Sequence, residues 1–260
     1  MSDNTRKPGE TGVKTDEKKQ HFDDIYVQPN PVAFKERIID ALDYVSDDFN
    51  RATFDRLILP WCEQQAGRDT PLRFVDLCCC FGNTTLAVAH GMSVEEIRDN
   101  WKNVDSCRAP AKPRRFPVEV TGIDISGPAL AYGKEAGIFD AVIEADLNAP
   151  SPAARQGAER AMEEADVVIS TASLVYLDLA AIEGLIDRFS APSRPGYLLV
   201  NFLNPFALEK ADATKRLLLD KLDFVGSTAS RHRRLSPLEQ ENYPGEEWAL
   251  LELWVLRRRA

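Results

Sequence analysis

The stretch Phe-Val-Asp-Leu-Cys-Cys-Cys-Phe-Gly at residues 74–82 decides the fold of this chain. The apolar run at 72–77 predicts a buried strand, and residues 83–90, closed by Gly91, predict a helix directly behind it. A strand that turns into a helix is the first half of a β-α unit, and doubly wound sheets bind their ligands at the carboxyl ends of such strands. The stretch therefore predicts an α/β protein with its site at residues 76–82.

The same alternation of strands and helices continues from this stretch to the end of the sequence. Further strands are predicted at 118–123, 141–144, 167–170, 197–203, 224–230 and 248–256. Helices are predicted between them, at 126–137, 153–165, 179–189 and 206–220, with a short capped helix from Ser93. Repeated β-α units predict a parallel sheet covered on both faces. The fold class is a Rossmann-like αβα sandwich, with a mostly parallel seven-stranded sheet and an antiparallel C-terminal strand.

The region before this domain has a different character. Residues 1–20 are polar and charged, which predicts a disordered tail, and residues 21–70 predict a helical N-terminal cap. Asn30 and Pro31 predict the start of the first helix, and Pro60 predicts a bend in the second. Apolar residues recur three and four apart in both: Phe34, Ile38, Leu42 and Val45, then Phe54, Leu57, Ile58 and Trp61. The domain proper is expected to span residues 71–260.

Net charge disfavours one class of partner. The 260 residues carry a formal charge of −9, whereas proteins that grip nucleic acid backbones are usually basic. Basic clusters at 112–115, 231–234 and 257–259 are interpreted as solvated loops or tails. The sequence thus predicts no nucleic acid partner.

The cysteines and the apolar runs indicate the compartment. Five cysteines are an odd number, and the consecutive Cys78, Cys79 and Cys80 cannot all pair with one another. No paired C-x-x-C pattern is present, so no metal site is predicted, and reduced thiols are expected. The sequence shows neither a signal peptide nor a membrane span. A cytoplasmic protein without a membrane partner is the resulting expectation.

Residues 74–82 resemble motif I of class I S-adenosylmethionine (SAM)-dependent methyltransferases, an acidic residue, an apolar residue and then Gly-x-Gly-x-Gly. The resemblance implies SAM as cofactor, with Asp76 facing its methionine amino group directly or through water and Gly82 as the last glycine. Cys78 and Cys80 stand at the first two glycine positions, where positive φ is common. Because cysteine carries a Cβ, a more open or differently routed turn is expected. A packing role for Cys79 is preferred, and a redox role for the cysteines stays open.

Asp124 follows the second predicted strand. A carboxylate there can accept both hydroxyl protons of a ribose, and Ile125 is counted beside it as a cofactor contact. The alternative, a helix N-cap, is better filled by Ser126. The distance from Gly82 to Asp124 is about twice the ~20 residues of a dinucleotide-binding unit, and the extra capped helix and basic loop account for it.

Two later strand ends complete the resemblance. Asp146 would accept from the adenine amino group and Leu147 would lie against the ring, although a surface turn is the alternative for the aspartate. The strand ending at Ser170 is similar to motif IV, so residues 170–176 would line the boundary between SAM and acceptor. Residues 21–26 and the Asp-Leu-Cys-Cys variant further resemble a bacterial branch of the family.

The acceptor side has weaker signals. Tyr26, Tyr44, Tyr176 and Asn204 are the candidates for binding the acceptor, because they fall in the cap or just beyond strand ends; a core role is the alternative for the tyrosines. Catalytic residues are not assigned. The only histidines are His21, His90 and His232, and a structural role is preferred for His90.

The sequence favours a methyltransferase that acts on a small molecule, with O- or N-methylation as the expected chemistry. In-line displacement at a sulfonium depends mainly on alignment and exclusion of water, so a nucleophile-base pair is not required. Two alternatives stay open: a non-catalytic SAM-binding regulatory subunit, and an NAD(P)-dependent oxidoreductase, which Cys78 and Cys80 disfavour.

Overall fold

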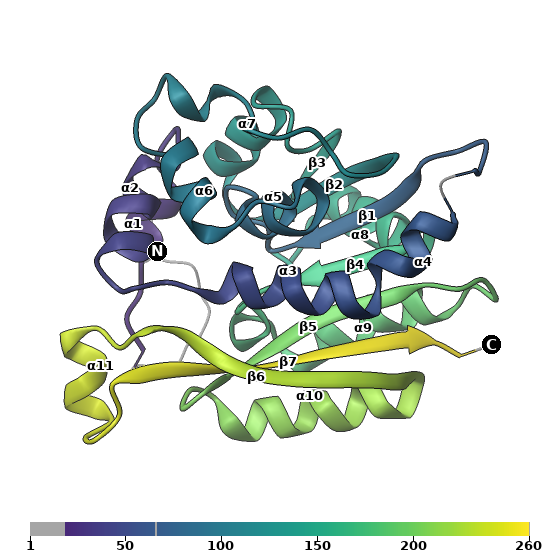
Figure 1. Ribbon diagram of the computed structural model, residues 1–260. Coiled ribbons are helices and arrows are strands. Elements are labelled where there is room, and N and C mark those ends of the chain that lie inside the picture. Colours follow the sequence, from purple (N-terminus) through teal and green to yellow (C-terminus); the bar gives the residue numbers. More distant parts are fainter. Residues whose placement is uncertain (1–18, 66, 260) are drawn as a thin grey trace, which may run out of the picture.

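A seven-stranded sheet runs through the protein in the order β3-β2-β1-β4-β5-β7-β6 (Figure 1). The computed structural model describes residues 19–65 and 67–259. Its strands are β1 (Leu72–Leu77), β2 (Val118–Asp124), β3 (Ala141–Glu144), β4 (Val167–Ser170), β5 (Tyr197–Asn204), β6 (Leu222–Arg234) and β7 (Trp248–Arg258). Strands β1 to β5 pair in parallel, while β7 is antiparallel to both β5 and β6. The predicted sheet, with its one antiparallel strand, is confirmed.

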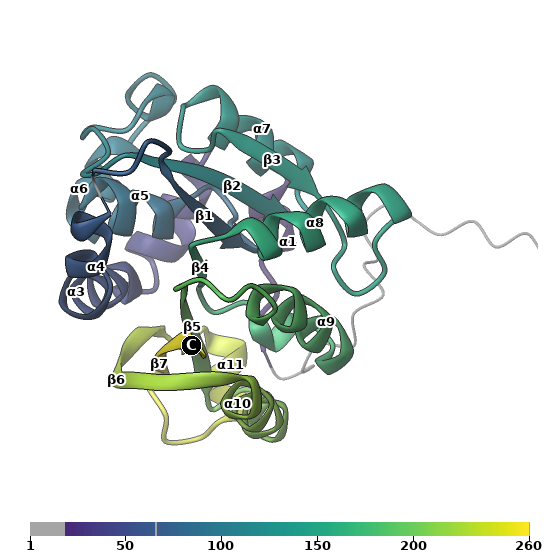
Figure 2. The same cartoon turned by 90° about the vertical axis from the view of Figure 1, so that its right-hand side faces the viewer.

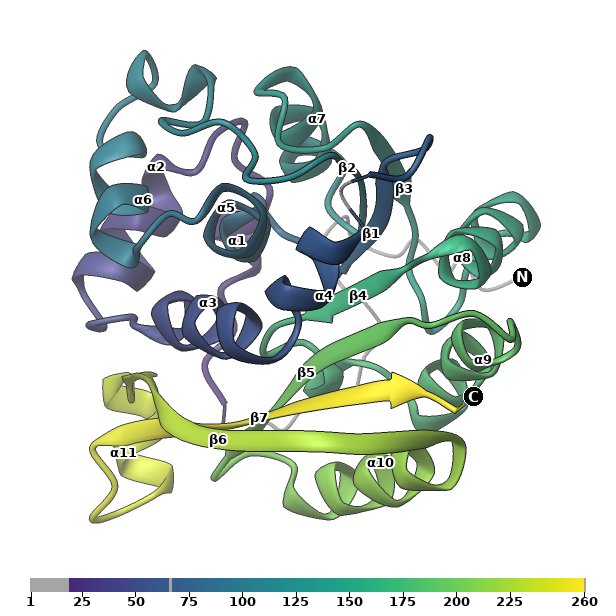
Figure 3. The same ribbon diagram turned by 45° about the vertical axis from the view of Figure 1, so that its right-hand side comes forward.

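The antiparallel strand is not at the edge of the sheet. Strand β7 lies between β5 and β6 (Figure 3). After β5 the chain therefore forms the edge strand β6 first, and β7 then inserts between the two. Strand β6 consequently runs in the same direction as β1 to β5, and its carboxyl end reaches the same rim of the sheet. We call this side the carboxyl rim.

Helices cover the sheet on both faces (Figure 2). One face carries α3 (Ser46–Leu57), α5 (Asn83–His90), α6 (Val94–Asn100) and α7 (Gly127–Glu135). The other carries α8 (Pro152–Glu164), α9 (Leu179–Ser190) and α10 (Leu208–Lys221). Two predicted helix boundaries are confirmed. Ser93 and Glu96 form a capping box at the start of α6, and Gly91 ends α5 with φ 69°. The αβα sandwich is confirmed.

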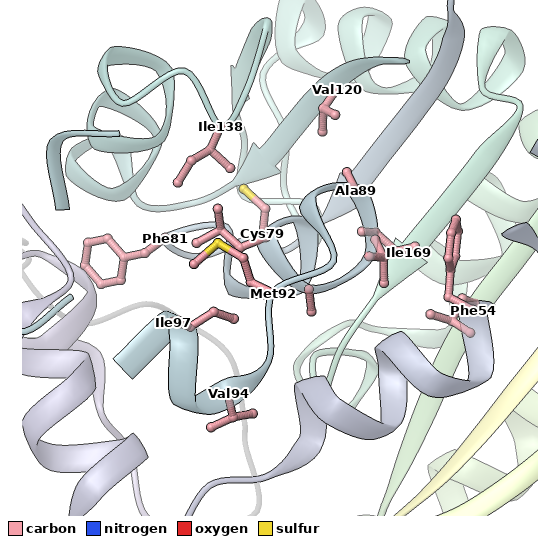
Figure 4. Packing of buried hydrophobic residues seen from close by; sticks show 14 of the residues in the cluster. Phe54, Cys79, Phe81, Ala89, Met92, Val94, Ile97, Val120, Ile138 and Ile169 are labelled. Atoms are coloured by element: carbon pink, nitrogen blue, oxygen red, sulfur yellow. The ribbon is translucent and has the colours of Figure 1, made fainter. Parts of the chain in front are cut away.

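The two layers have separate cores, because successive side chains of a strand point to opposite faces. Phe74 packs with the α3 and α5 side, whereas Val75 packs with the α8 and α9 side. Figure 4 shows the first core, with Cys79 among apolar side chains and directed toward Ile138. Cys79 is 4% exposed, as its preferred packing role requires.

The cap differs from its prediction in one turn. The remaining cap elements are α1 (Asp23–Tyr26), α2 (Val32–Phe34), the π-helix η1 (Lys35–Asp40) and α4 (Leu59–Gln64). The π-helical hydrogen bonds reach five residues back, as from Tyr44 N to Ile39 O at 3.2 Å. This wider turn rotates the apolar face, so Tyr44 is buried where the 3.6-residue period had placed Val45. The break before Pro60 is confirmed at Ile58.

The interpretation of 231–234 as a solvated loop is wrong, because β6 continues to Arg234. Arg233 is 3% exposed and forms two 2.7 Å hydrogen bonds to Glu239 of α11 (Pro237–Asn242). Arg231 and Arg234 lie on the opposite side, each 4.7 Å from the ring of Trp248. A register shift between Arg231 and Arg233 interrupts the strand alternation, so the cluster consists of a buried cation and two outer ones.

The other two basic clusters are also parts of the folded structure. Arg115 pairs with Asp55 at 2.7 Å, so it fastens the loop before β2 to α3. Arg258 is 2% exposed in β7, and it donates to the carbonyls of Phe189 and, at 2.8 Å, Ala165. Burial lowers the pKa of Arg258 to about 10.

The predicted tail at 1–20 falls largely outside the described residues. Its last two positions are described, and both are in contact with the domain: Lys19 donates to the Tyr176 hydroxyl, and Gln20 N donates to Glu239 at 3.1 Å. The folded structure therefore includes residues that were assigned to the tail. Within residues 19–65 and 67–259, no helix is long and apolar enough to cross a membrane.

Candidate functional site

The loop after β1 has an unusual backbone. Cys78, Cys80 and Gly82 have φ values of 57°, 51° and 86°, so every second residue is left-handed. This conformation costs a residue with a Cβ roughly 1–2 kcal/mol, and glycine almost nothing. Both cysteines thus take the conformation for which glycine is suited. The expected rerouting of the turn is wrong at these two positions; the loop carries strain instead.

Gly82 is required for a second reason. A Cβ on Gly82 would lie 2.7 Å from Cγ2 of Ile138 and 3.0 Å from the ring of Phe139. Gly82 also precedes α5, and its carbonyl accepts from Leu86 N at 2.9 Å. The glycine therefore lets α5 begin against the segment that follows α7.

Asp124, the last residue of β2, faces this loop. Its Oδ2 accepts from Cys80 N and its Oδ1 from Ser126 N, both at 2.8 Å. Each carboxylate oxygen has two acceptor positions, so one on each remains for a ligand. Burial raises the pKa of Asp124. Ile125, by contrast, is 48% exposed and offers an apolar surface beside the carboxylate.

Asp76 lies below the loop. It is 1% exposed, and its Oδ2 accepts from Thr85 Oγ1 at 2.7 Å, which ties β1 to α5. Burial raises the pKa of Asp76 well above its ordinary value, and the nearby Asp47 and Asp124 charges raise it further. The structure therefore brings Asp76 to the site but leaves its carboxyl group covered.

The loop after β3 completes the row of strand ends. Asp146 accepts from Asn148 N at 3.0 Å, and Leu147 is 9% exposed. The Asn148 side chain donates to Tyr176 O at 3.0 Å and accepts from Asp178 N at 2.7 Å. The loops after β3 and β4 are thereby connected through one amide. The carboxyl rim brings Asp76, Asp124 and Asp146 to three adjacent strand ends.

Ser170 supports the same rim from β4. It is 1% exposed, and its hydroxyl lies 3.2 Å from Leu77 O and 2.5 Å from Ser173 Oγ. Burial raises the pKa of Cys78, and a hydrogen bond with Ser173 partly offsets this increase. Ser170 is thus placed to hold the turn after β4 against the end of β1.

A buried polar network beside this row was missed from the sequence. Asp47 of α3, 1% exposed, accepts from Tyr44 at 2.9 Å, Thr84 at 3.1 Å and the amides of Asn50 and Asn83 at 3.2 and 2.8 Å. All four partners are neutral, and burial raises the pKa of Asp47. The sequence signal for this network is a spacing of three residues between Tyr44, Asp47 and Asn50. Polar residues at this spacing lie on one side of a helical chain.

The network continues to β4 and β5. Thr171 Oγ1 lies 3.0 Å from both Thr84 Oγ1 and Asn50 Nδ2. Asn201 of β5 bonds Asn50 at 3.4 Å and accepts from Ala172 N. Asn201 is buried and belongs to this network. Asn204, the candidate for binding the acceptor, is exposed at the end of the same strand.

The candidate tyrosines have different surroundings. Tyr44 has its hydroxyl within the Asp47 network, where it also accepts from Asn83 at 3.2 Å. Burial raises the pKa of Tyr26 well above its ordinary value, and nearby Cys80, Tyr176 and Asp124 are further contributors. Tyr26 and Tyr176 are therefore the two tyrosines that border the row of strand ends.

The histidines occupy separate places. His90 ends α5 at the far rim, where Nδ1 lies 2.7 Å from Lys112 O; His21 is exposed. His232 was placed in a loop, but it lies in β6, is 6% exposed and hydrogen-bonds Ser46 through Nδ1. Burial, together with the charges of Arg233 and Lys19, lowers the pKa of His232 well below its ordinary value.

Comparisons with known proteins give matches among solved structures. Magnesium protoporphyrin IX methyltransferase of Synechocystis, crystallised with SAM, has a TM-score of 0.44 and 13% identity, over 80% of this chain and 79% of that one. Geranyl diphosphate C-methyltransferase of Streptomyces coelicolor has a TM-score of 0.42 and 12% identity, over 77% of this chain and 74% of that one. A TehB-like SAM-dependent methyltransferase of Corynebacterium glutamicum has a TM-score of 0.39 and 11% identity, over 75% of this chain and 85% of that one.

No protein-family model matches this chain, and no curated protein matches it either. Among residues 19–65 and 67–259, no group of three or more His, Cys, Asp or Glu side chains is arranged to hold a metal ion.

Proposed function

We propose that the protein is a class I SAM-dependent methyltransferase that methylates a small molecule. One observation carries the proposal: the hydrogen bond from Cys80 N to Asp124 Oδ2, at 2.8 Å. It joins a left-handed loop at the end of β1 to the terminal carboxylate of β2. Loop and carboxylate belong to the two strand ends at which motif I and the ribose-binding acid are expected.

The residues present fit SAM. Asp124 has one open acceptor position on each oxygen for the two ribose hydroxyls. The exposed side chain of Ile125 and the half-buried Asp146 border the expected place of the adenine. Asp76 is covered, so its part is to position the loop through Thr85 rather than to touch the ligand. Cys78, Cys80, Gly82, Leu147 and Ser170 shape and support the same site. The unit is residues 71–260, with 21–70 as its cap.

The mechanism needs alignment more than acid-base chemistry. Bound SAM supplies an electrophilic methyl group on a good leaving group. The chain has to hold the acceptor in line with that methyl group and exclude water. Tyr26 and Tyr176 border the acceptor side, and the saturated Asp47 network fixes α3 and the turn after β4 around it. O- or N-methylation is proposed, since either acceptor needs only a lone pair directed at the methyl carbon.

The thiols fit a reducing compartment. All five cysteines are free. Because intracellular proteins generally keep their thiols reduced, the cytoplasm is proposed as the location.

Calorimetric titration tests the proposal. SAM and S-adenosylhomocysteine (SAH) are expected to bind to the full chain, and NAD is not. Tight binding of NAD without SAM would establish an oxidoreductase in its place. If SAM binds, SAH release is then measured with a panel of phenols, acids and amines. Binding of SAM without turnover of any member would favour the regulatory alternative.

A further inference from the structure

Lys19 presents a buried ammonium group at the carboxyl rim. Its side chain comes from the N-terminal segment that runs from α1 toward α11 (Figure 1), and the residue is 4% exposed. The ammonium donates to the Tyr176 hydroxyl, and its other hydrogen bond is to Gln20 O at 3.4 Å. Both acceptors are neutral. Burying a charge is costly unless an opposite charge accompanies it, and no carboxylate of residues 19–65 and 67–259 accompanies this one.

The surrounding charges leave this ammonium unmatched. Arg233 is neutralised by Glu239 with two 2.7 Å hydrogen bonds, and Lys210 donates to the carbonyls of Val175 and Leu177 on either side of Tyr176. His232 is uncharged near neutral pH, because burial lowers its pKa. Within the described part of the chain, no carboxylate forms an ion pair with Lys19. Among the described residues, the cations of this corner therefore outnumber its carboxylates.

Aromatic rings lie close to the cations of this corner. The Phe206 ring centroid lies 5.8 Å from the Lys19 ammonium, and Tyr243 packs edge-on against Phe206 at 5.4 Å. On the other side, Phe22 lies 5.3 Å from the Arg233 guanidinium. Such rings favour a ligand with a flat apolar body. The Tyr176 oxygen accepts from Lys19, so its own O–H is available to donate to a ligand.

We propose that this corner binds the carboxylate of a small aromatic acid, with the Lys19 ammonium and the Tyr176 hydroxyl as its two donors. The inference rests on the proposed function, since the acid is the methyl acceptor. The carboxylate anchors the acceptor through these two donors. Recognition by a charged donor also explains why a neutral analogue of the same shape would bind more weakly.

Matched probes test this inference on the full chain saturated with SAH. Binding of 4-hydroxybenzoate and 4-hydroxybenzamide is measured by calorimetry, with 4-hydroxyphenylacetate and its amide as a second pair. We expect each acid to bind at least about tenfold more tightly than its amide, because only the acid pairs with the ammonium. Lys19→Met should abolish that preference and leave the SAH affinity unchanged. Tyr176→Phe should reduce it.

Lys102→Met is the control, because Lys102 is exposed and is distant in sequence from every residue of the corner. It should keep the full preference for the acids. Equal binding of acid and amide to the unaltered protein would overturn the inference, as would an unchanged preference in Lys19→Met. Neither result affects the proposed function, which fails only if SAM and SAH themselves do not bind.

Discussion

The buried aspartates at the two rims of the sheet differ in their hydrogen-bond partners, whereas the buried Glu239 beyond β6 is paired with Arg233. At the amino rim, Asp166 is 3% exposed just before β4, and it forms ion pairs with Arg68 and Arg194 and accepts from Arg73 N at 3.0 Å. At the carboxyl rim, Asp47, Asp76 and Asp124 are equally buried, but their described hydrogen-bond partners are all neutral. Removing one partner from a buried ion pair is strongly destabilising, because it leaves the other charge uncompensated. Buried carboxyl groups without a cation have raised pKa values, and such groups are candidates for a functional site.

The backbone follows the same division. Five non-glycine residues of the described chain have positive φ, and four of them follow the carboxyl ends of β1, β4 and β5: Cys78, Cys80, Ala172 and Ala207. Strained backbone is retained where the surrounding structure holds it in place, and it gathers at functional sites. We therefore expect the amino rim to contribute mainly to stability and the carboxyl rim to bind the ligand.

The largest effect that would test this division is expected at Asp166. Asp166→Ala removes the partner of two arginines and of a backbone N–H, and the free energy of unfolding should fall by about 3 kcal/mol. Urea titration measures this change. The affinity for SAH should remain within twofold of the unaltered protein. A large loss of SAH affinity in a folded variant would contradict the comparison.

Asp124→Ala should have the complementary effect. Loss of the charged acceptor for the ribose hydroxyls should weaken SAM binding by ~2–3 kcal/mol, measured by calorimetry. Asp140→Ala is the matched control, since Asp140 lies at the amino end of β3, where it accepts from Val120 N at 2.7 Å. If both variants bind SAM equally well, Asp124 has no part in the site.

Acid titration sharpens the comparison at Asp76. Burial raises the pKa of Asp76 above its ordinary value of 3.8, so the folded protein keeps this proton after the unfolded chain has lost it. The contribution of Asp76 to stability therefore falls as the pH rises above 3.8, by at most ~1.4 kcal/mol per pH unit for one proton. Asp76→Asn should gain stability relative to the unaltered protein from pH 4 to pH 6, in urea titrations. A constant difference would show that Asp76 titrates normally.

The smallest expected effect concerns the strained loop. Cys80→Gly should raise the free energy of unfolding by about 1 kcal/mol, because glycine takes the left-handed conformation without strain. Cys79→Gly, in the same tripeptide but packed in the core, should instead lower it by about 2 kcal/mol. Thermal unfolding distinguishes the two. Destabilisation by both glycines would show that the Cys80 side chain contributes more than its backbone strain costs.

Local sequence patterns were sufficient for most of the fold. Strand β1 was predicted from one apolar run and the end of helix α5 from Gly91. Ser93 and Glu96 predicted the capping box of α6. The carboxylates at strand ends could be placed for the same reason, since parallel strands end on one rim. The π-helix at 35–40 could not, because its rotation of the chain depends on packing rather than on a local period.

Long-range partners explain what the sequence analysis missed. Arg233 lies in a run of basic residues typical of a solvated loop, and its burial depends on Glu239 and on the register shift between Arg231 and Arg233 in β6. Asp47 resembles an ordinary acidic residue of a first helical turn. Its partners Asn83 and Thr84 are brought to it only when α5 packs on α3. Lys19 likewise gains its contact with Tyr176 from the folded arrangement.

Asn148 gives the molecule a mechanical property. One amide side chain bonds Tyr176 O and Asp178 N, so the loop after β3 and the turn after β4 cannot shift independently. This amide spans the ends of β2 and β1, which separate the strands of the two loops in the sheet.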